Sequence, residues 1–174
     1  SSLSDELKDN VDILINNSGG PHGGLLIESE IEEFRLAFER LLICNQIVTK
    51  SVISTMKNQD YGRIINIIST SIKQVIPGLG VSNTIRGAVA QWAKTLALEL
   101  GKYNITVNNV LPGYTKTSRL DELADSKAKT LNVVKADIEE SWAESTALNR
   151  LAEPIEIASV VLFLASNDSS YITG

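Results

Sequence analysis

The sequence predicts an α/β protein built on a parallel sheet with helices between its strands. Strand-like and helix-like segments alternate along the 174 residues, an order typical of this architecture. The strand-like segments are almost entirely apolar, as expected for strands that are covered on both faces. The length fits one domain, and 43% of the residues are hydrophobic, which is enough for a buried core.

The first strand is predicted at residues 11–15, and the turn-forming residues 16–21 end it. Apolar residues with helical spacing follow from residue 30 to about residue 57, as one long helix or two joined pieces. Ser29 and Glu32 have the spacing of a capping box, which predicts that Ser29 is the N-cap of this helix.

The second strand is predicted at residues 63–68, an isoleucine-rich run that contains Asn66. After a Pro-Gly loop at residues 77–80, a helix is predicted at residues 82–100, and its small residues allow another helix or subunit to approach closely. Gly101 is predicted to end this helix in a left-handed conformation. A third strand is predicted at residues 105–111.

The last part of the sequence predicts helices only. Residues 116–145 are polar, with apolar residues interspersed, and predict one or two short helices over a cleft. Residues 151–166 predict a final helix with Pro154 in its first turn, where a missing backbone N–H is tolerated.

Composition and charge argue against several classes of function. The net charge is -5 and no Lys/Arg-rich run occurs, so nucleic-acid binding is not expected. The single cysteine, Cys44, allows no intrachain disulfide, and a reduced, cytoplasmic setting is expected. The only histidine, His22, is far from Cys44 in sequence, so a zinc site is not expected. Neither a signal peptide nor a bilayer-spanning apolar stretch is found, so no membrane partner is expected.

Seven short motifs occur in an order that resembles the short-chain dehydrogenase/reductase family. They are Asn-Asn-Ser-Gly at 16–19, Asn-Ile-Ile-Ser at 66–69, Leu-Ala-Leu-Glu-Leu at 96–100, Ile-Thr-Val-Asn at 105–108, Pro-Gly-Tyr-Thr-Lys-Thr at 112–117, Phe-Leu-Ala-Ser at 163–166 and Tyr-Ile-Thr-Gly at 171–174. No single motif is specific, but their order and spacing extend the resemblance along nearly the whole chain. The resemblance implies a Rossmann-like, doubly wound parallel sheet that binds a nicotinamide dinucleotide.

The resemblance begins partway into the family's fold. The family opens with a strand, a glycine-rich turn and a helix that hold the cofactor pyrophosphate, and this sequence has no such turn. The sequence also stops before the family's last strand. We therefore expect residues 1–174 to form a single, partial Rossmann-type domain that lacks the N-terminal strands and the last strand. Exposed strand edges would make such a piece unstable alone.

The family uses a Tyr-x-x-x-Lys pair, one helical turn apart, as proton donor and cation, and a serine that orients the substrate oxygen. Ser69 matches that serine, although it could instead satisfy backbone groups at the strand end. Ser82 stands at the tyrosine position and Arg86 at the lysine position. A serine hydroxyl is far less acidic than a tyrosine hydroxyl. Arg86 can still bind a cofactor ribose, or it forms an ion pair on the helix surface.

A fourth family position, an asparagine that holds a proton-relay water, falls near Leu41, which cannot hold that water. Two substitutes for the missing proton donor are Tyr114, beside the Pro112–Gly113 loop, and His22, because histidine exchanges protons near neutral pH. The alternative for each is a solvated loop residue without a catalytic role.

The resemblance also assigns cofactor contacts. The backbone of three small or polar residues would approach the adenosine side, namely Asn17, Ser18 and Gly19. Four residues would lie along the nicotinamide and pyrophosphate, namely Pro112, Gly113, Thr115 and Thr117, unless Pro-Gly serves only to form a turn. The resemblance implies NAD or NADP as the cofactor. The choice between them stays open, because the residue that selects one in the family lies outside this sequence.

Taken as implications of the resemblance, these residues point to an NAD(P)-dependent oxidoreductase acting on a small carbonyl or alcohol substrate, such as a 3-oxoacyl thioester, a sugar or a polyol. The changes at Ser82, Arg86 and Leu41 leave an alternative, a non-catalytic nucleotide-binding paralogue with a degenerate site. A homodimer or homotetramer is expected, because the family's two central helices pack against a partner subunit. We expect the strand ends to bring the Asn17 loop, Ser69, Arg86 and the 112–113 loop to one crevice.

Overall fold

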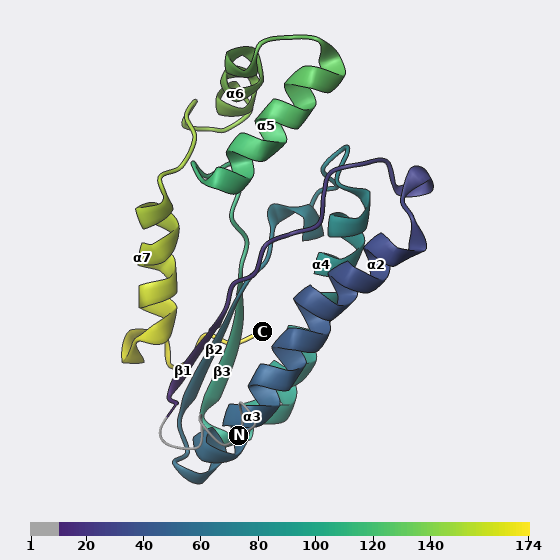
Figure 1. The fold of residues 1–174 in the computed structure, drawn as a ribbon. Coiled ribbons are helices and arrows are strands. Elements are labelled where there is room, and N and C mark those ends of the chain that lie inside the picture. The colour runs from purple at the N-terminus through teal and green to yellow at the C-terminus, as the bar shows by residue number, and fades with distance from the viewer. Residues whose placement is uncertain (1–10) are drawn as a thin grey trace. The chain divides into compact units, whose positions relative to one another are not determined.

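The computed structural model describes residues 11–174, which form two compact units (Figure 1). The first unit comprises the described residues up to Leu111 together with residues 161–174, and the second comprises residues 112–160. The first unit holds the sheet and the two longest helical segments.

The sheet has three parallel strands in the order β1 (Ile13–Asn16), β2 (Gly62–Ile67) and β3 (Ile105–Val110). This confirms the predicted α/β class with parallel strands. The central strand β2 is buried along its length except at its last residue, as its isoleucine-rich sequence requires. Because the strands are parallel, their carboxyl ends lie at one edge of the sheet.

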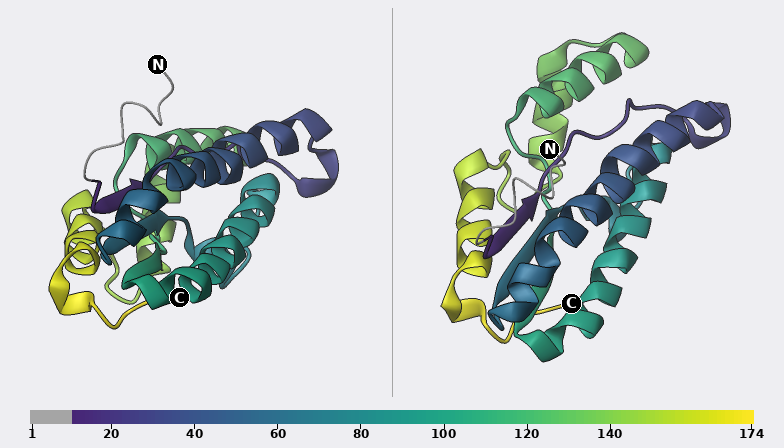
Figure 2. Two further views of the ribbon diagram at one scale, coloured as in Figure 1. Left: turned by 90° about the horizontal axis from the view of Figure 1, so that it is seen from below. Right: turned by 60° about the horizontal axis from the view of Figure 1, so that its bottom comes forward.

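The predicted long helix is continuous. It consists of α2 (Ile31–Phe38), a π-helical turn (Glu39–Ile43) and α3 (Cys44–Asn58). With α4 (Gly80–Leu100) it covers one face of the sheet, and the views in Figures 1 and 2 agree on this arrangement. The core between them contains buried residues of both helices and of β2 and β3, namely Val52, Met56, Ile64, Ala93, Ala97, Leu100, Ile105 and Val107.

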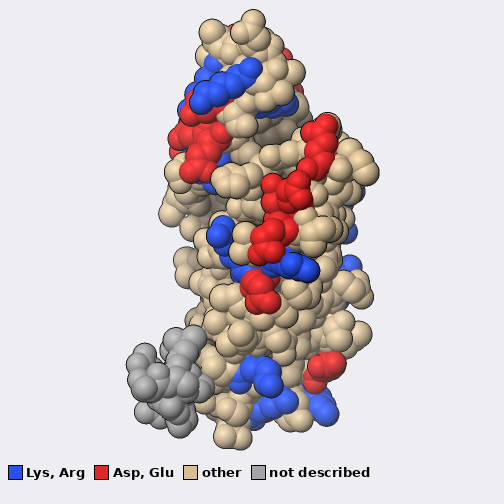
Figure 3. Space-filling view, turned by 45° about the vertical axis from the view of Figure 1, so that its right-hand side comes forward, with Lys and Arg blue, Asp and Glu red and all other residues tan. Residues whose placement is uncertain are grey.

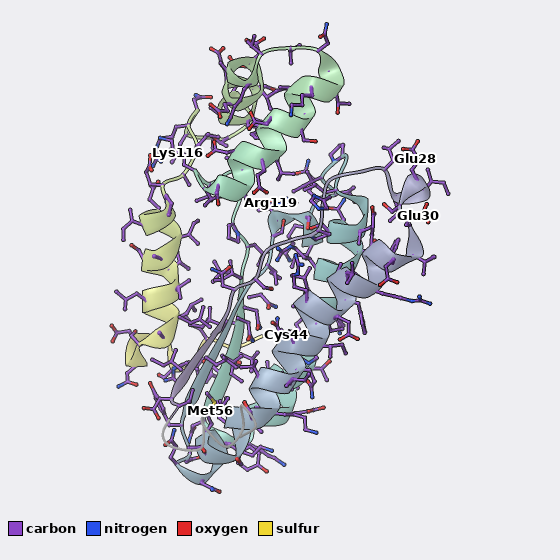
Figure 4. All side chains as sticks on the ribbon, viewed as in Figure 1. Glu28, Glu30, Cys44, Met56, Lys116 and Arg119 are labelled. Atoms are coloured by element: carbon purple, nitrogen blue, oxygen red, sulfur yellow. The ribbon has the colours of Figure 1, made fainter. Side chains whose placement is uncertain are left out.

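Met56 marks the lower end of this core (Figure 4) and explains why a glycine begins β2. Met56 is fully buried, and a Cβ atom built on Gly62 would lie 2.7 Å from its sulfur atom. Any larger residue at position 62 would therefore displace the methionine.

The C-terminal residues run along the outer edge of β3. The backbone N–H of Val107 donates to the Thr173 hydroxyl at 3.0 Å, and the Gly174 N–H donates to the Val107 carbonyl at 3.0 Å. The Asn108 side chain donates to the Ile172 carbonyl at 2.8 Å. Thr173 and Gly174 thus bond to the backbone of Val107, and Ile172 bonds to the side chain of Asn108.

The second unit is built from α5 (Ser118–Leu131), α6 (Lys135–Glu144) and the first part of α7 (Pro154–Ala165). The polar region therefore forms two short helices, and Pro154 is the first residue of the final helix, as predicted. Lys135 joins the two short helices, since its ammonium lies 3.1 Å from Asp121, 3.5 Å from Asp125 and 3.8 Å from Glu139. None of the helices in residues 11–174 is long and apolar enough to cross a membrane.

Two predictions about helix ends are wrong. Glu30, not Ser29, is the N-cap of α2, because residues 26–28 form a short 3-10 turn and the Ser29 hydroxyl donates to the Leu25 carbonyl at 3.0 Å. Gly101 has a φ of -54° and continues α4 into a 3-10 turn. The left-handed residue is Asn104, with a φ of 54°, a conformation that asparagine tolerates better than most residues.

Candidate active site at the carboxyl ends of the strands

A row of asparagines joins the carboxyl ends of the three strands. Asn16, Asn66 and Asn109 are paired in the sheet register. The Asn66 side chain accepts a hydrogen bond from the Asn16 amide at 2.8 Å and donates to the Asn109 side-chain oxygen at 3.2 Å. Asn66 is completely buried, where an unpaired amide would be costly, so these bonds fix the strand ends relative to one another.

This row was not predicted from the sequence, although one signal of it is present. An asparagine inside the run Ile-Ile-Asn-Ile-Ile is unusual, because a buried amide requires polar partners. The partners lie 50 residues earlier and 43 residues later in the chain, so only the sheet register reveals them.

Ser69 lies just beyond β2, three residues after Asn66. Its hydroxyl accepts a hydrogen bond from the Ser71 N–H at 3.1 Å, which caps the short turn at residues 70–72. The hydroxyl proton is not used in this bond, and within residues 11–174 we find no acceptor for it. Ser69 is half-buried and therefore has a proton that it can donate to a ligand oxygen.

Arg86 reaches the same strand end from α4. Its Nη1 donates to the carbonyl oxygen of Ile67, the last residue of β2, at 3.2 Å. Ile67 lies only two residues before Ser69, so the structure brings a guanidinium and the Ser69 loop together. A guanidinium has five donors in a fixed plane, a number that allows it to bind several oxygen atoms.

Ser82 lies one helical turn before Arg86, in the first turn of α4, and only 7% of its surface is exposed. The predicted spacing of the two residues is present, since both lie on one helix. A serine carries its hydroxyl one bond from Cβ, so the Ser82 oxygen stays close to the helix backbone. A tyrosine at this position would carry its hydroxyl beyond an entire ring.

Leu41 lies in the π-helical turn of the long helix and is 3% exposed. It packs in a cluster that includes Ile68, next to Ser69, and Ile85, next to Arg86. An apolar cluster therefore fills the position near which the family has its water-binding asparagine. Single π turns inside helices are common at functional sites. In this π turn the buried side chain is the apolar Leu41.

The loop after β1 is open at the residues predicted to approach the adenosine. Asn17 and Gly19 are exposed, and a Cβ atom built on Gly19 would meet nothing within 4 Å. Its backbone is therefore accessible to a ligand. His22 is exposed farther along this loop, and no hydrogen bond to its ring is found in the described part of the chain. Within residues 11–174 no hydrogen bond between His22 and Ser69 is found.

This loop is clasped to the loop that precedes α4. The Gly24 N–H donates to the Gly78 carbonyl at 2.7 Å, and the Gly80 N–H donates to the Gly24 carbonyl at 3.2 Å. A Cβ atom on Gly80 would lie 2.6 Å from the Cα of Leu26, so only glycine permits this approach. The clasp was not predicted, because the sequence of a Gly-rich loop does not reveal which segment the loop contacts.

The remaining predicted cofactor residues belong to the second unit. Pro112 and Gly113 lie in the segment that follows β3, and the Thr115 hydroxyl donates to the Gly113 carbonyl at 3.2 Å. Thr117 is the N-cap of α5, where its hydroxyl accepts from the Leu120 N–H at 3.3 Å. A shallow pocket of about 360 Å³ adjoins Thr117 and is lined by Lys116, Thr117, Ser118, Leu120, Asp121, Glu139 and Leu151.

Tyr114, the other candidate proton donor, is engaged in packing within the second unit. Its ring stacks on that of Trp142, with ring centres 5.1 Å apart and planes inclined by 11°. It lies against the buried cluster formed by α5 and α6. Figure 4 labels Lys116 and Arg119 near the beginning of α5, a few residues after Tyr114 in the chain.

The arrangement in the first unit fits the ribose end of a dinucleotide. Arg86 supplies donors that suit ribose hydroxyls, Ser69 supplies a hydroxyl proton, and the Gly19 backbone is open. Within the described residues we find no group of three or more His, Cys, Asp or Glu side chains that could hold a metal ion.

Comparison with known proteins supports the same reading of the fold. A family model described as "Enoyl-(Acyl carrier protein) reductase" matches residues 2–174. The chain is 30% identical over 164 residues to the NADPH-dependent reductase BacG of Bacillus subtilis (strain 168), a match that covers 94% of this chain and 63% of BacG. It is 32% identical over 170 residues to the 3-oxoacyl-[acyl-carrier-protein] reductase FabG of Aquifex aeolicus (strain VF5), covering 97% of this chain and 63% of FabG.

A solved structure of NAD+-bound xylitol dehydrogenase is similar with a TM-score of 0.90 and 27% sequence identity, covering 99% of this chain and 69% of that one. This similarity confirms the predicted Rossmann-like fold class. The chain spans less than two thirds of the length of the curated relatives it matches, 63% for both BacG and FabG.

Proposed function

The chain belongs to the short-chain dehydrogenase/reductase family, and from this premise we propose that the protein binds NAD or NADP and transfers a hydride between the nicotinamide and a carbonyl or alcohol carbon of a small molecule. One observation carries the proposal. Arg86 donates to the Ile67 carbonyl at 3.2 Å, two residues before Ser69, so a cation and a hydroxyl proton lie at one strand end. Such a pair can bind a substrate oxygen and a ribose hydroxyl.

Each residue has a role in this proposal. Ser69 donates its proton in a hydrogen bond to the substrate oxygen, and Arg86 binds the ribose next to the nicotinamide. The backbone of residues 17–19 accommodates the adenosine side, and four residues of the 112–117 segment, namely Pro112, Gly113, Thr115 and Thr117, contact the nicotinamide and pyrophosphate. The bound dinucleotide supplies or accepts the hydride.

A second function is favoured by Ser82 and Leu41. Reduction of a carbonyl requires a proton for the oxygen, and Ser82 is a poor acid with 7% of its surface exposed. Leu41, at 3% exposure, is enclosed by apolar neighbours and cannot hold a relay water. These two residues favour a nucleotide-binding protein without turnover, in which Arg86 and the residue 17–19 loop still bind the dinucleotide.

One experiment separates the two functions. NADH and NADPH are titrated into the protein while nucleotide fluorescence is followed, and turnover is then measured with 3-oxoacyl thioesters, sugars and polyols. If the protein is an oxidoreductase, we expect turnover. Ser69→Ala should then reduce turnover at least tenfold and leave nucleotide binding unchanged. Binding without turnover supports the second function. If neither nucleotide binds, both functions are wrong.

We also propose a homodimer or homotetramer formed through the long helix and α4. Three large apolar side chains on these helices are exposed, Leu36 at 58%, Ile47 at 57% and Leu98 at 88%. Apolar side chains on neighbouring helices are typical of subunit interfaces. Analytical ultracentrifugation tests this proposal, because a monomer at micromolar concentration would contradict it.

A further inference from the structure

A pocket of about 310 Å³ lies at the amino ends of β2 and β3, at the edge of the sheet opposite the candidate active site. It is formed by the turns that lead into these two strands and by the segment after α7. All its lining residues belong to the first unit, namely Asp60, Tyr61, Arg63, Asn104, Asn167 and Ser170. The proposed function does not use this pocket.

Arg63 is a buried cation without a carboxylate partner. Only 3% of its surface is exposed. Its Nη1 donates to the carbonyls of Gly62 at 2.9 Å and Asn104 at 3.4 Å, and its Nε donates to the Ser166 carbonyl at 3.4 Å. Carbonyl oxygens carry only partial charge, and within residues 11–174 no ion pair of Arg63 is found. Because a guanidinium stays protonated when buried, its charge favours an anion at this place.

The remaining guanidinium nitrogen, Nη2, opens onto the pocket. The Tyr61 ring covers one face of the guanidinium, with its centre 4.4 Å from the guanidinium carbon. In the described part of the chain Nη2 has no acceptor, yet it is not one of the polar atoms that are sealed off from solvent without a partner. It therefore reaches the pocket with two N–H groups to donate. The Asn167 amide and the Ser170 hydroxyl line the same pocket and can add donors.

The charge around the pocket is positive on balance. Among the lining residues Asp60 alone is acidic, and its carboxylate accepts a hydrogen bond from the Asn104 amide. Two lysines lie in the same turns, three residues before Asp60 and two residues before Asn104. Their ammonium groups, Lys57 and Lys102, lie 4.8 and 5.1 Å from the centre of the Tyr103 ring. With Arg63 they outweigh the single carboxylate.

This end of the first unit is basic although the chain as a whole is acidic. Residues 41–111 contain seven Lys and Arg against two Asp and Glu, whereas the whole chain has a net charge of -5. Figure 3 shows the contrast on one face, with a line of acidic side chains above and basic side chains near the lower end, where α3 ends. The field at this end therefore attracts anions.

We propose that this pocket binds a phosphate group, either as free phosphate or as a phosphate monoester, through Nη2 of Arg63. Phosphate oxygens accept strong, charge-assisted hydrogen bonds from a guanidinium. The Asn167 amide and the Ser170 hydroxyl complete the site, and Lys57 and Lys102 raise the local concentration of the anion. Because the pocket lies at the opposite edge of the sheet, its ligand does not compete with the dinucleotide, and the proposal does not rest on the proposed function.

The test is thermal unfolding followed by circular dichroism, while sodium phosphate or glycerol 1-phosphate replaces sodium chloride at constant ionic strength. The midpoint temperature is expected to rise with phosphate and to saturate, because a ligand that binds only the folded state stabilises it. Asn167→Asp and Ser170→Asp place a carboxylate at the pocket and leave Arg63 and its carbonyl partners intact. Each should raise the half-saturating phosphate concentration at least tenfold. A larger response to glycerol 1-phosphate than to phosphate would identify the ligand as a monoester.

Two controls make the result decisive. Ser126→Asp adds the same charge at an exposed position of α5 in the second unit and should leave the phosphate response unchanged. Arg86→Met should also leave it unchanged. The proposal is overturned if phosphate has no effect beyond that of chloride, or if Ser126→Asp weakens the response as much as Asn167→Asp does. It is also overturned if only Arg86→Met abolishes the response, because the phosphate would then occupy the candidate dinucleotide site.

Discussion

At the scale of single residues, Asn66 fixes the geometry on which the candidate site depends. It has no exposed surface, and its amide bonds to Asn16 on one side and Asn109 on the other. The Ser69 loop begins three residues later, and Arg86 donates to the carbonyl of Ile67, the residue that follows Asn66. The strand ends that lead to Ser69 and to the loop after β1 are therefore joined by a buried side chain as well as by backbone pairing.

Replacing Asn66 by alanine is expected to lower the free energy of unfolding by about 3 kcal/mol, because the amides of Asn16 and Asn109 lose their partner in a dry environment. Urea denaturation followed by circular dichroism measures the change. Asn17→Ala is the control, since Asn17 is exposed and its replacement should change stability by less than about 0.5 kcal/mol. Equal effects of the two substitutions would show that the asparagine row does not stabilise the sheet.

At the scale of elements, the clasp between the two loops depends on a close backbone approach. Gly80 begins α4, and a Cβ atom there would lie within 2.6–2.7 Å of three atoms of Leu26. Gly87 lies in the same helix, but a Cβ atom there would meet nothing within 4 Å. The structure thus requires glycine at position 80, whereas it leaves room for a side chain at position 87.

Gly80→Ala is expected to destabilise the protein by about 1–3 kcal/mol, because the backbone of Leu26 has to move. Gly87→Ala is expected to stabilise it by up to about 1 kcal/mol, because alanine is the better helix former. Thermal unfolding of both variants tests the pair. A Gly80→Ala protein as stable as the original would mean that the clasp is not needed.

The beginning of α7 predicts a pH dependence in the second unit. Glu156 receives two hydrogen bonds from Arg150, at 2.7 and 2.6 Å, and one from the Glu153 N–H at 2.8 Å. The bonds from Arg150 have the largest effect and the bond from the Glu153 N–H comes next. Together they lower the pKa of Glu156 from its ordinary 4.5 to about 2. Because the folded-state pKa is lowered, the stabilising contribution is complete above pH 4.5 and is lost as the pH falls towards 2.

Glu156→Gln is accordingly expected to destabilise the protein at pH 7, and the difference from the original protein should shrink as the pH falls from about 5 to about 2. Urea denaturation at several pH values measures this difference. Glu140→Gln, an exposed position on α6, is the control and should change stability little at any of these pH values. A Glu156→Gln difference that is constant with pH would contradict the ion pair.

At the scale of the whole molecule, the sequence predicts the elements well because their signals are local. The apolar runs identified all three strands to within two residues at each end, and helical spacing identified the long helix and α4. Ser69 and Arg86 were assigned from the resemblance to the family, and their roles in binding stay predictions.

The features that were missed depend on contacts between distant segments. The asparagine row joins residues 50 and 43 positions apart, and the Gly24 clasp joins two loops that contain similar turn residues. The two helix ends were wrong for a different, local reason. The Ser29 hydroxyl had a competing carbonyl at Leu25, and Asn104 took the left-handed position expected of Gly101.

The central claim is that Arg86, held at the end of β2, binds the dinucleotide, and its most direct test is the dissociation constant for NADH and NADPH. Arg86→Met is expected to raise that constant by about 10- to 100-fold, because hydrogen bonds from a charged group are lost. Lys94→Met, an exposed position on the same helix, should leave it unchanged. An Arg86→Met protein that remains folded by circular dichroism and binds both nucleotides as tightly as the original would contradict the claim.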